Sequence, residues 1–189
     1  AQELVRLAAS IGADAVKFQW LSRAERLCER RRAPEYLGAY RLLQFPEAWF
    51  SDLASRTADH GIEFLCTAFL PEDVHVVARY VTRFKVASFE ARAWDLIEAH
   101  VAFMAADQLA GRERWMVMSR GMGADHSSGL PYALLPLTRF LLCTSAYPAP
   151  AEGLNLRRLL MRIFFPCRAY GLISSRTEYT IWRIASRWL

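Results

Sequence analysis

Residues 63–69 read Glu-Phe-Leu-Cys-Thr-Ala-Phe, an apolar run of strand length that begins two residues after Gly61. Similar strand-like runs lie along the rest of the chain, at residues 14–19, 83–88, 115–121, 140–147 and 169–175. Stretches with apolar residues at helical spacing lie between several of them, at residues 48–60, 73–80 and 93–110. Apolar strands that alternate with helices are typical of a parallel sheet covered by helices.

This alternation predicts the α/β fold class and, within it, a TIM-type (β/α) barrel. A complete barrel has eight strands and about 250 residues, whereas about six strands are recognisable in this chain of 189 residues. We therefore expect an incomplete barrel over residues 1–175, without the first and last strands, and a divergent C-terminal tail over residues 176–189. In that tail, residues 182–189 favour a packing helix over a helix on a membrane surface.

The composition is that of a folded protein, because 53% of the residues are hydrophobic and the mean hydropathy is +0.06. Charged residues interrupt every apolar run before about 18 residues, so we expect no transmembrane helix. The net charge is +5, but the basic clusters at residues 30–32 and 157–158 match no nucleic-acid-binding motif. We therefore expect neither nucleic acid nor membrane as a partner. The four scattered cysteines indicate reduced thiols and a cytoplasmic protein.

Lysine is rare in this chain: of the 24 basic residues, 22 are arginines, and the two lysines are Lys17 and Lys85. Both lie within apolar strand-like runs. A compact ammonium group binds anions differently from a planar guanidinium, so two lysines in matching positions predict an anion site. We expect both to extend from the C-terminal ends of separate strands into one pocket. The alternative for each is a side chain that reaches the edge of the core and meets a carboxylate or water.

Five segments form a recognisable pattern when they are taken in order. They read Gly12-Ala13-Asp14-Ala15-Val16-Lys17-Phe18-Gln19, Phe64-Leu65-Cys66-Thr67-Ala68-Phe69, Phe84-Lys85-Val86-Ala87-Ser88, Ser119-Arg120-Gly121-Met122 and Leu141-Leu142-Cys143-Thr144-Ser145-Ala146-Tyr147-Pro148-Ala149-Pro150. In this order they resemble successive parts of the N-acetylneuraminate (sialic acid) synthase family. The resemblance extends over roughly residues 1–175.

The resemblance implies a transferase that condenses phosphoenolpyruvate with an N-acylated aldose of the N-acetylmannosamine type. The products are a nine-carbon 2-keto sugar acid and phosphate, in sialic acid biosynthesis. The resemblance also implies a TIM barrel and a divalent metal, Mn or Mg, that polarises the aldehyde. Members of the family are commonly dimers, so a homodimer is among the partners that the resemblance suggests.

Position by position, the resemblance assigns roles to residues at the strand ends. Those around phosphoenolpyruvate are Lys17, Thr67, Lys85, Ser88, Ser119 and Ser174. The catalytic candidates near the sugar are Glu90 and Tyr147. The Glu90 carboxylate would accept hydrogen bonds from sugar hydroxyls or transfer a proton. The alternative for Thr67 and Ser119 is a hydroxyl that satisfies a strand end, and for Tyr147 an aromatic ring that anchors a turn.

The family's metal ligands are not found in this chain. Arg176 stands where the family has a metal-binding His, and a guanidinium offers no lone pair to a metal. Phe89 stands where the family has a Gly, and Arg120 where it has a Thr. None of the four histidines falls at a family ligand position. We expect His60, His75 and His100 on helix surfaces and His126 in a loop.

These departures leave alternatives to an active synthase. One is a catalytically inactive fragment or pseudoenzyme that retains a phosphate-binding pocket. Another keeps the barrel and changes the chemistry, to a different phosphoenolpyruvate-using sugar-acid synthase or to an aldolase that forms a Schiff base with one of the lysines.

Overall fold

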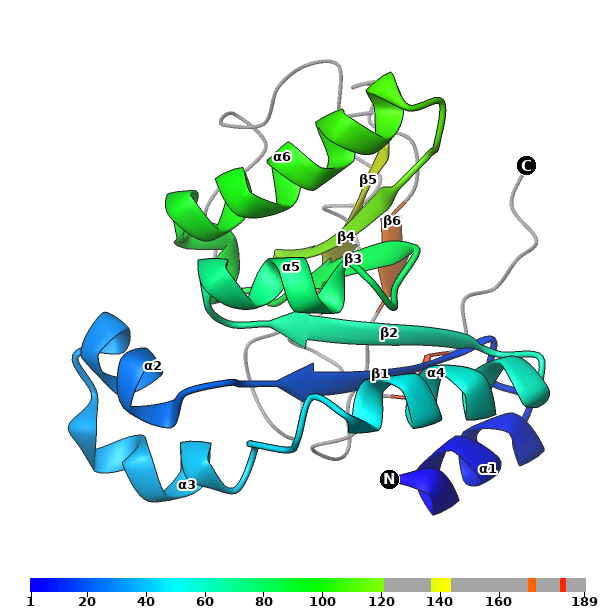
Figure 1. Ribbon diagram of the computed structural model, residues 1–189, viewed down its shortest axis with the longest axis horizontal. Helices are drawn as coiled ribbons and strands as arrows, with labels where there is room; N and C mark the ends of the chain where they lie inside the picture. Colours follow the sequence, from blue (N-terminus) through cyan, green and yellow to red (C-terminus); the bar gives the residue numbers. More distant parts are fainter. Residues whose placement is uncertain (121–136, 144–169, 173–180, 183–189) are drawn as a thin grey trace. The chain divides into compact units, whose positions relative to one another are not determined.

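The computed structural model describes residues 1–120, 137–143, 170–172 and 181–182 (Figure 1). The chain divides into two compact units. Unit 1 comprises Ala1–Thr82 and a short strand at Ile181–Trp182, and unit 2 comprises the described residues from Arg83 up to that strand.

Unit 1 is built on two parallel strands, β1 and β2. Its elements are α1 (Gln2–Ser10), β1 (Ala15–Trp20), α2 (Ala24–Arg31), the 3₁₀ helix η1 (Pro34–Tyr36), α3 (Leu37–Arg41), α4 (Trp49–Asp59), β2 (Glu63–Ala68), the 3₁₀ helix η2 (Pro71–Asp73), α5 (Val74–Val77) and β7 (Ile181–Trp182). β1 pairs with β2 from Ala15 opposite Glu63 to Trp20 opposite Ala68, and β7 pairs with β1 antiparallel. Figure 1 shows α2 and α3 beyond the C-terminal end of β1.

Unit 2 contains four parallel strands and one long helix. Its elements are β3 (Arg83–Val86), the 3₁₀ helix η3 (Glu90–Arg92), α6 (Trp94–Leu109), β4 (Trp115–Arg120), β5 (Thr138–Leu142) and β6 (Tyr170–Leu172). The four strands lie side by side in the order of the chain. Phe84, Met116 and Phe140 lie on one face of this sheet and are almost completely buried. The ring contacts of Phe84 with His100 and Phe103 show that α6 covers that face.

Glycine ends the helix before two of the predicted strands. Gly61 and Gly111 have φ angles of +67° and +70°, which an L side chain rarely adopts. Beyond them, the Ile62 N–H donates to the Thr57 carbonyl and the Arg112 N–H to the Asp107 carbonyl. These bonds close the Schellman turn that stops a helix and turns the chain into the next strand.

His100 is a core residue, contrary to the expected surface position. It is 1% exposed, because it lies four residues after Leu96 and four before Met104, on the apolar face of α6. Its Nδ1 donates to the Leu96 carbonyl at 2.7 Å, and its ring meets Phe84 edge-on at 4.7 Å. Burial lowers the pKa of His100 to about 4. The imidazole is therefore neutral at pH 7.

Two further expectations differ from the structure. The helix expected over residues 73–80 is α-helical only over Val74–Val77. Trp182, expected to begin a helix, ends β7 instead, because its backbone pairs with Ala15. η1 and α3 were not recognised in the sequence, since no strong apolar period marks them. No helix in the described ranges is both long and apolar enough to cross a membrane.

Candidate functional site

The C-terminal half of β1 and β2 presents polar side chains on one shared face. Lys17 pairs with Leu65 and Gln19 with Thr67, and alternate residues of a strand point to the same side. Phe18 and Phe64 lie on the opposite face, where their ring centroids are 6.0 Å apart. Lys17, Gln19 and Thr67 therefore belong to one face of unit 1. Gln19, which lies in the first of the quoted segments, shares this face although it was not predicted as a site residue.

Thr67 has a buried hydroxyl with no hydrogen-bond partner within the described part of the chain. The residue is 0% exposed. Burying a hydroxyl without a partner costs about 1–3 kcal/mol. Native proteins rarely keep such an atom, so an unsatisfied donor at a strand end needs an explanation, and a bound ligand oxygen is one.

Lys85 and Ser119 meet in unit 2. Lys85 Nζ donates to Ser119 Oγ at 2.7 Å and to the Val86 carbonyl at 2.8 Å. Both side chains are buried, at 4% exposure each. Lys85 is opposite Val117, two residues before Ser119, so both side chains lie on the face of the sheet away from Phe84 and α6. An ammonium and a hydroxyl thus converge near the C-terminal ends of β3 and β4.

Glu90 and Ser88 follow β3 at the same edge. Glu90 opens η3 and is 4% exposed, whereas Ser88 is half-buried. η3 packs against β4, the strand that carries Ser119. Unit 2 therefore places a buried carboxyl group, a buried ammonium group and two hydroxyls on neighbouring strand ends.

The remaining assigned residues are distributed differently. Tyr147, Ser174 and Arg176 lie outside the described residues. Lys17 belongs to unit 1 and Lys85 to unit 2, so their shared pocket stays a prediction.

Arg120 does not join the hydroxyls at the end of β4. It follows Ser119 and so points to the opposite face, where its guanidinium lies 4.9 Å from the centre of the Phe140 ring. The exchange of the family's Thr for Arg at this position therefore changes the helix-covered layer of the sheet and leaves the face of Lys85 and Ser119 intact.

Asp73 links the ends of β1 and β2, and nothing in the sequence pattern pointed to it. Its carboxylate accepts hydrogen bonds from the Ser22 backbone N–H at 3.2 Å and the Ser22 hydroxyl at 2.5 Å. Burial raises the pKa of Asp73, against the opposing effect of these bonds. Burial likewise raises the pKa of the Cys66 thiol on β2. Cys66 is therefore an unreactive core thiol.

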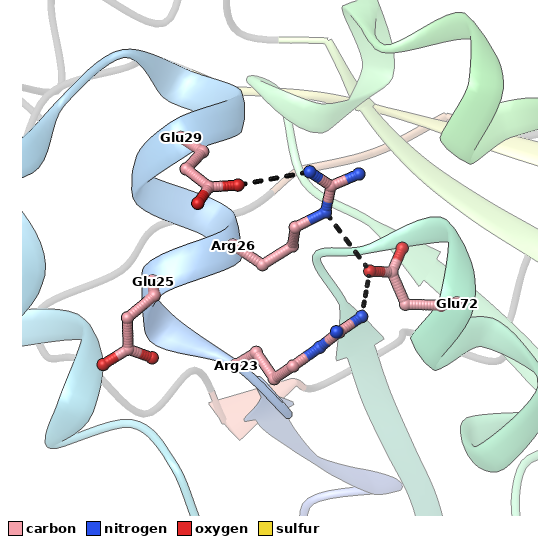
Figure 2. A pocket seen from close by; sticks show the side chains of 5 residues that line it. All are labelled: Arg23, Glu25, Arg26, Glu29 and Glu72. Carbon is pink, nitrogen blue, oxygen red and sulfur yellow. Dashed lines mark hydrogen bonds and ion pairs between the residues drawn. The ribbon is translucent and has the colours of Figure 1, made fainter.

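Figure 2 shows an open pocket of about 460 Å³ in unit 1, lined by Arg23, Glu25, Arg26, Glu29 and Glu72. Arg23 bridges to Glu72 at 2.6 Å and Arg26 to Glu29 at 3.2 Å, while Glu25 pairs with Arg41 at 2.6 Å. Each carboxylate of the lining thus has a cation beside it. The pocket contains none of the residues assigned above, and its charges hold α2 to η2.

Within the described ranges, no group of three or more His, Cys, Asp or Glu side chains is arranged to hold a metal ion. Among the assigned residues that the structure describes at the strand ends, Glu90 alone has a carboxyl group. The others have hydroxyl groups or ammonium groups, and an ammonium has no lone pair for a metal. The described residues therefore do not fit the divalent metal that the resemblance implies.

Comparison with known proteins gives consistent matches. The model of the NeuB family matches residues 4–174. An uncharacterised protein of Methanocaldococcus jannaschii is 26% identical over 169 residues, which are 84% of this chain and 45% of that protein. The pseudaminic acid synthase of Campylobacter jejuni is 24% identical over 127 residues, 64% of this chain and 34% of that protein.

Among solved structures, the N-acetylneuraminic acid synthetase of Leptospira borgpetersenii, in complex with citrate, has a TM-score of 0.72 to this chain. It is 22% identical and is matched over 90% of this chain and 57% of its own. This likeness defines the class first: the fold is α/β and corresponds to part of a TIM-type barrel, as predicted. Because the family model covers most of the residues, the chain belongs to the NeuB family. It spans about half the length, or less, of the relatives that it matches.

Proposed function

We propose that this chain is the phosphoenolpyruvate-binding part of a sugar-acid synthase, which condenses phosphoenolpyruvate with an N-acylated aldose of the N-acetylmannosamine type. The products are a nine-carbon 2-keto sugar acid and phosphate. The observation that carries the proposal is the contact of Lys85 Nζ with Ser119 Oγ at 2.7 Å. Two residues 34 positions apart, both assigned to phosphoenolpyruvate on sequence grounds, form one buried donor group. Membership of the NeuB family supports the reaction class.

In this proposal, Lys85 and Ser119 hold an anionic group of phosphoenolpyruvate. The ammonium supplies the positive charge, and Ser119, whose oxygen accepts from Lys85, directs its own proton to a phosphate or carboxylate oxygen. Charge-assisted hydrogen bonds of this kind are about twice as strong as neutral ones. Lys17 on β1 and Thr67 on β2 likewise supply an ammonium group and a hydroxyl group. The Thr67 hydroxyl has no hydrogen-bond partner among the described residues, and an oxygen of the anion would accept its hydrogen bond. Ser88 and Ser174 add further hydroxyls to this set.

The sugar is assigned to Glu90 and Tyr147. C3 of phosphoenolpyruvate forms a bond to the aldehyde carbon, whose oxygen gains a proton. Water then adds to C2 and releases one proton. The C2–O bond to phosphate breaks as the new C2 hydroxyl loses its proton, which leaves the 2-keto acid and phosphate. Glu90 accepts a hydrogen bond from a sugar hydroxyl or moves one of these protons. No step assigned to these residues goes through a metal ion.

The setting of the proposed reaction is the cytoplasm, in a homodimer. The unpaired, buried thiols of Cys28 and Cys66 support the cytoplasmic part of this proposal. The homodimer rests on the resemblance alone.

Calorimetric titration of the full chain with phosphoenolpyruvate tests the proposal. Lys85→Met should weaken binding about 10- to 100-fold, the range for a hydrogen bond to a charged group. Arg83→Met is the matched control, because it removes a cation from the same strand two residues farther from the C-terminal end. Equal affinities of wild type and Lys85→Met would refute the anion site. Phosphate release on adding N-acetylmannosamine separates a synthase from an inactive phosphate binder, and borohydride trapping with pyruvate would reveal a Schiff-base aldolase.

A further inference from the structure

Two aromatic side chains lie exposed beside the buried acid of unit 2. Phe89 is 53% exposed and Trp94 is 48% exposed, and they flank η3, which begins with Glu90. Burial would stabilise either ring, and exposed aromatic surface next to a functional site is a common sign of ligand contact. Both rings belong to the segment that follows β3 at the edge carrying Lys85 and Ser119.

The backbone that carries these rings is firmly held. The Ala91 N–H donates to the Ala87 carbonyl at 2.9 Å, and the Ala93 N–H to the Glu90 carbonyl at 2.9 Å. Ala91, within η3, is buried. Phe89 and Trp94 therefore project from a fixed turn, so a ligand that contacts them loses little free energy in ordering the segment.

Two other exposed aromatic rings among the described residues stack on a ring of their own segment. Tyr36 stacks on Tyr40 at 5.9 Å, and Trp49 stacks on Phe45 at 5.9 Å. Those pairs bury one face of each ring against a neighbour on the same segment. Phe89 and Trp94 are distinguished by the residue that lies between them in the chain. That residue is Glu90, whose carboxyl group is buried.

A flat aromatic ring combined with a carboxyl group suits one class of ligand. The C–H face of a sugar is apolar and packs on an aromatic ring, whereas its hydroxyls donate to a carboxylate. Phosphoenolpyruvate is small and anionic, so it matches the Lys85–Ser119 pair instead. The two chemistries thus lie at adjacent positions of one strand edge.

We propose that Phe89 and Trp94 form an aromatic platform that holds the acylated sugar by its C–H face, next to Glu90. This inference rests on the proposed function for the identity of the sugar. The platform determines specificity, because it favours sugars with a continuous C–H face and contributes nothing to binding phosphoenolpyruvate.

The test measures N-acetylmannosamine and phosphoenolpyruvate binding separately, on the full chain. Saturation-transfer NMR gives the dissociation constant of the sugar, and calorimetry that of phosphoenolpyruvate. Phe89→Ala and Trp94→Ala should each weaken sugar binding about three- to tenfold, with the affinity for phosphoenolpyruvate changed less than about twofold. Phe89→Tyr, which keeps an aromatic ring, should bind the sugar with the wild-type dissociation constant. Leu109→Ala, which removes a 91% exposed apolar side chain at the far end of α6, is the control and should change neither.

The outcomes separate the platform from the proposed function. Unchanged sugar affinity in both alanine variants would overturn the platform and leave the function standing. Equal weakening of both ligands would also overturn it, since a ring that only supports the fold affects both. Sugar binding that depends on the rings, without phosphoenolpyruvate binding in the wild type, would overturn the function and keep the platform. A wild-type chain that binds neither ligand would overturn both.

Discussion

Units 1 and 2 carry the same kind of strand end but leave its hydroxyl in different states. In unit 2, Ser119 accepts a hydrogen bond from Lys85. In unit 1, the Thr67 hydroxyl has no hydrogen-bond partner among the described residues, although it is completely buried. A satisfied hydroxyl stabilises the protein without ligand, whereas an unsatisfied one lowers its stability and favours a ligand that completes it. The difference separates a hydroxyl whose acceptor capacity is used within the fold from one that has no partner among the described residues.

Each unit also buries a titratable group, and the pKa values of these two groups shift in opposite directions. Unit 2 buries a neutral imidazole, His100, whose pKa is lowered to about 4. Unit 1 buries a carboxyl group, Asp73, whose pKa is raised by burial. Both shifts disfavour the charged form, but their consequences for stability at low pH have opposite signs.

Acidification should weaken unit 2 through His100 and stabilise unit 1 through Asp73, and the His100 contribution is the largest expected effect. Between pH 6.5 and about 4 the unfolded chain binds a proton at His100 that the folded unit does not. At pH 4.5 unit 2 should lose roughly 2–3 kcal/mol. Asp73 takes up its proton more readily in the folded state, so falling pH stabilises unit 1 through this group. Hydrogen exchange of peptides from β4 and β1, at pH 7 and 4.5, measures both.

His100→Gln is the control for that experiment, because it removes the titrating group from α6. In this variant, the His100 contribution to the acid sensitivity of unit 2 should disappear, whereas that of Asp107, whose pKa is lowered by hydrogen bonds from Arg112 and Arg114, should stay. Equal acid sensitivity of β1 and β4 in the wild type would contradict the contrast between the units.

Ser119→Ala should destabilise the protein by about 2 kcal/mol, because the buried ammonium of Lys85 loses a hydroxyl acceptor. Urea unfolding followed by circular dichroism gives the change in free energy. Ser119→Thr keeps the hydroxyl and should recover much of the loss. An alanine variant as stable as the wild type would show that the Lys85–Ser119 bond contributes nothing to the fold.

Thr67→Val should act in the opposite direction. The side chains have nearly the same shape, and the valine removes an unsatisfied buried donor, so the unliganded protein should gain up to about 1 kcal/mol. Phosphoenolpyruvate affinity should fall about fivefold. Thr57→Val is the matched control in unit 1, since that equally buried hydroxyl donates to the Ala54 carbonyl at 2.8 Å. It should lose stability. A destabilised Thr67→Val would mean that the hydroxyl has a partner in the folded chain.

Glu72→Gln should have the smallest effect. Its carboxylate meets Arg23 at 2.6 Å, but the two side chains are 37% and 61% exposed. Exposed ion pairs contribute about 0.5 kcal/mol or less. The melting temperature should stay within error of the wild type, at low and high salt. A clearly lower melting temperature would show that the ion pairs of the charged pocket in Figure 2, and not only the buried core, stabilise unit 1.

The sequence located most of the strands because local patterns determine them. β2 begins at Glu63 and β4 at Trp115, as predicted, since apolar runs and the glycines before them act over a few residues. The same local signals did not mark the short helices between β1 and α4.

The rarity of lysine also singled out Lys17 and Lys85 without any structure, and the resemblance named Thr67 and Ser119. Only the tertiary structure decided what each of these groups contacts. Whether a buried hydroxyl is satisfied depends on strand register, which brings Ser119 to Lys85 across 34 residues and brings no such donor or acceptor to Thr67 among the described residues. For His100, the residue type suggested the surface, whereas its helical spacing from Leu96 and Met104 indicated the apolar face; the tertiary structure identified Phe84 as the ring that it contacts. Type and spacing are properties of the chain, but hydrogen-bond partners and burial are properties of packing between distant segments.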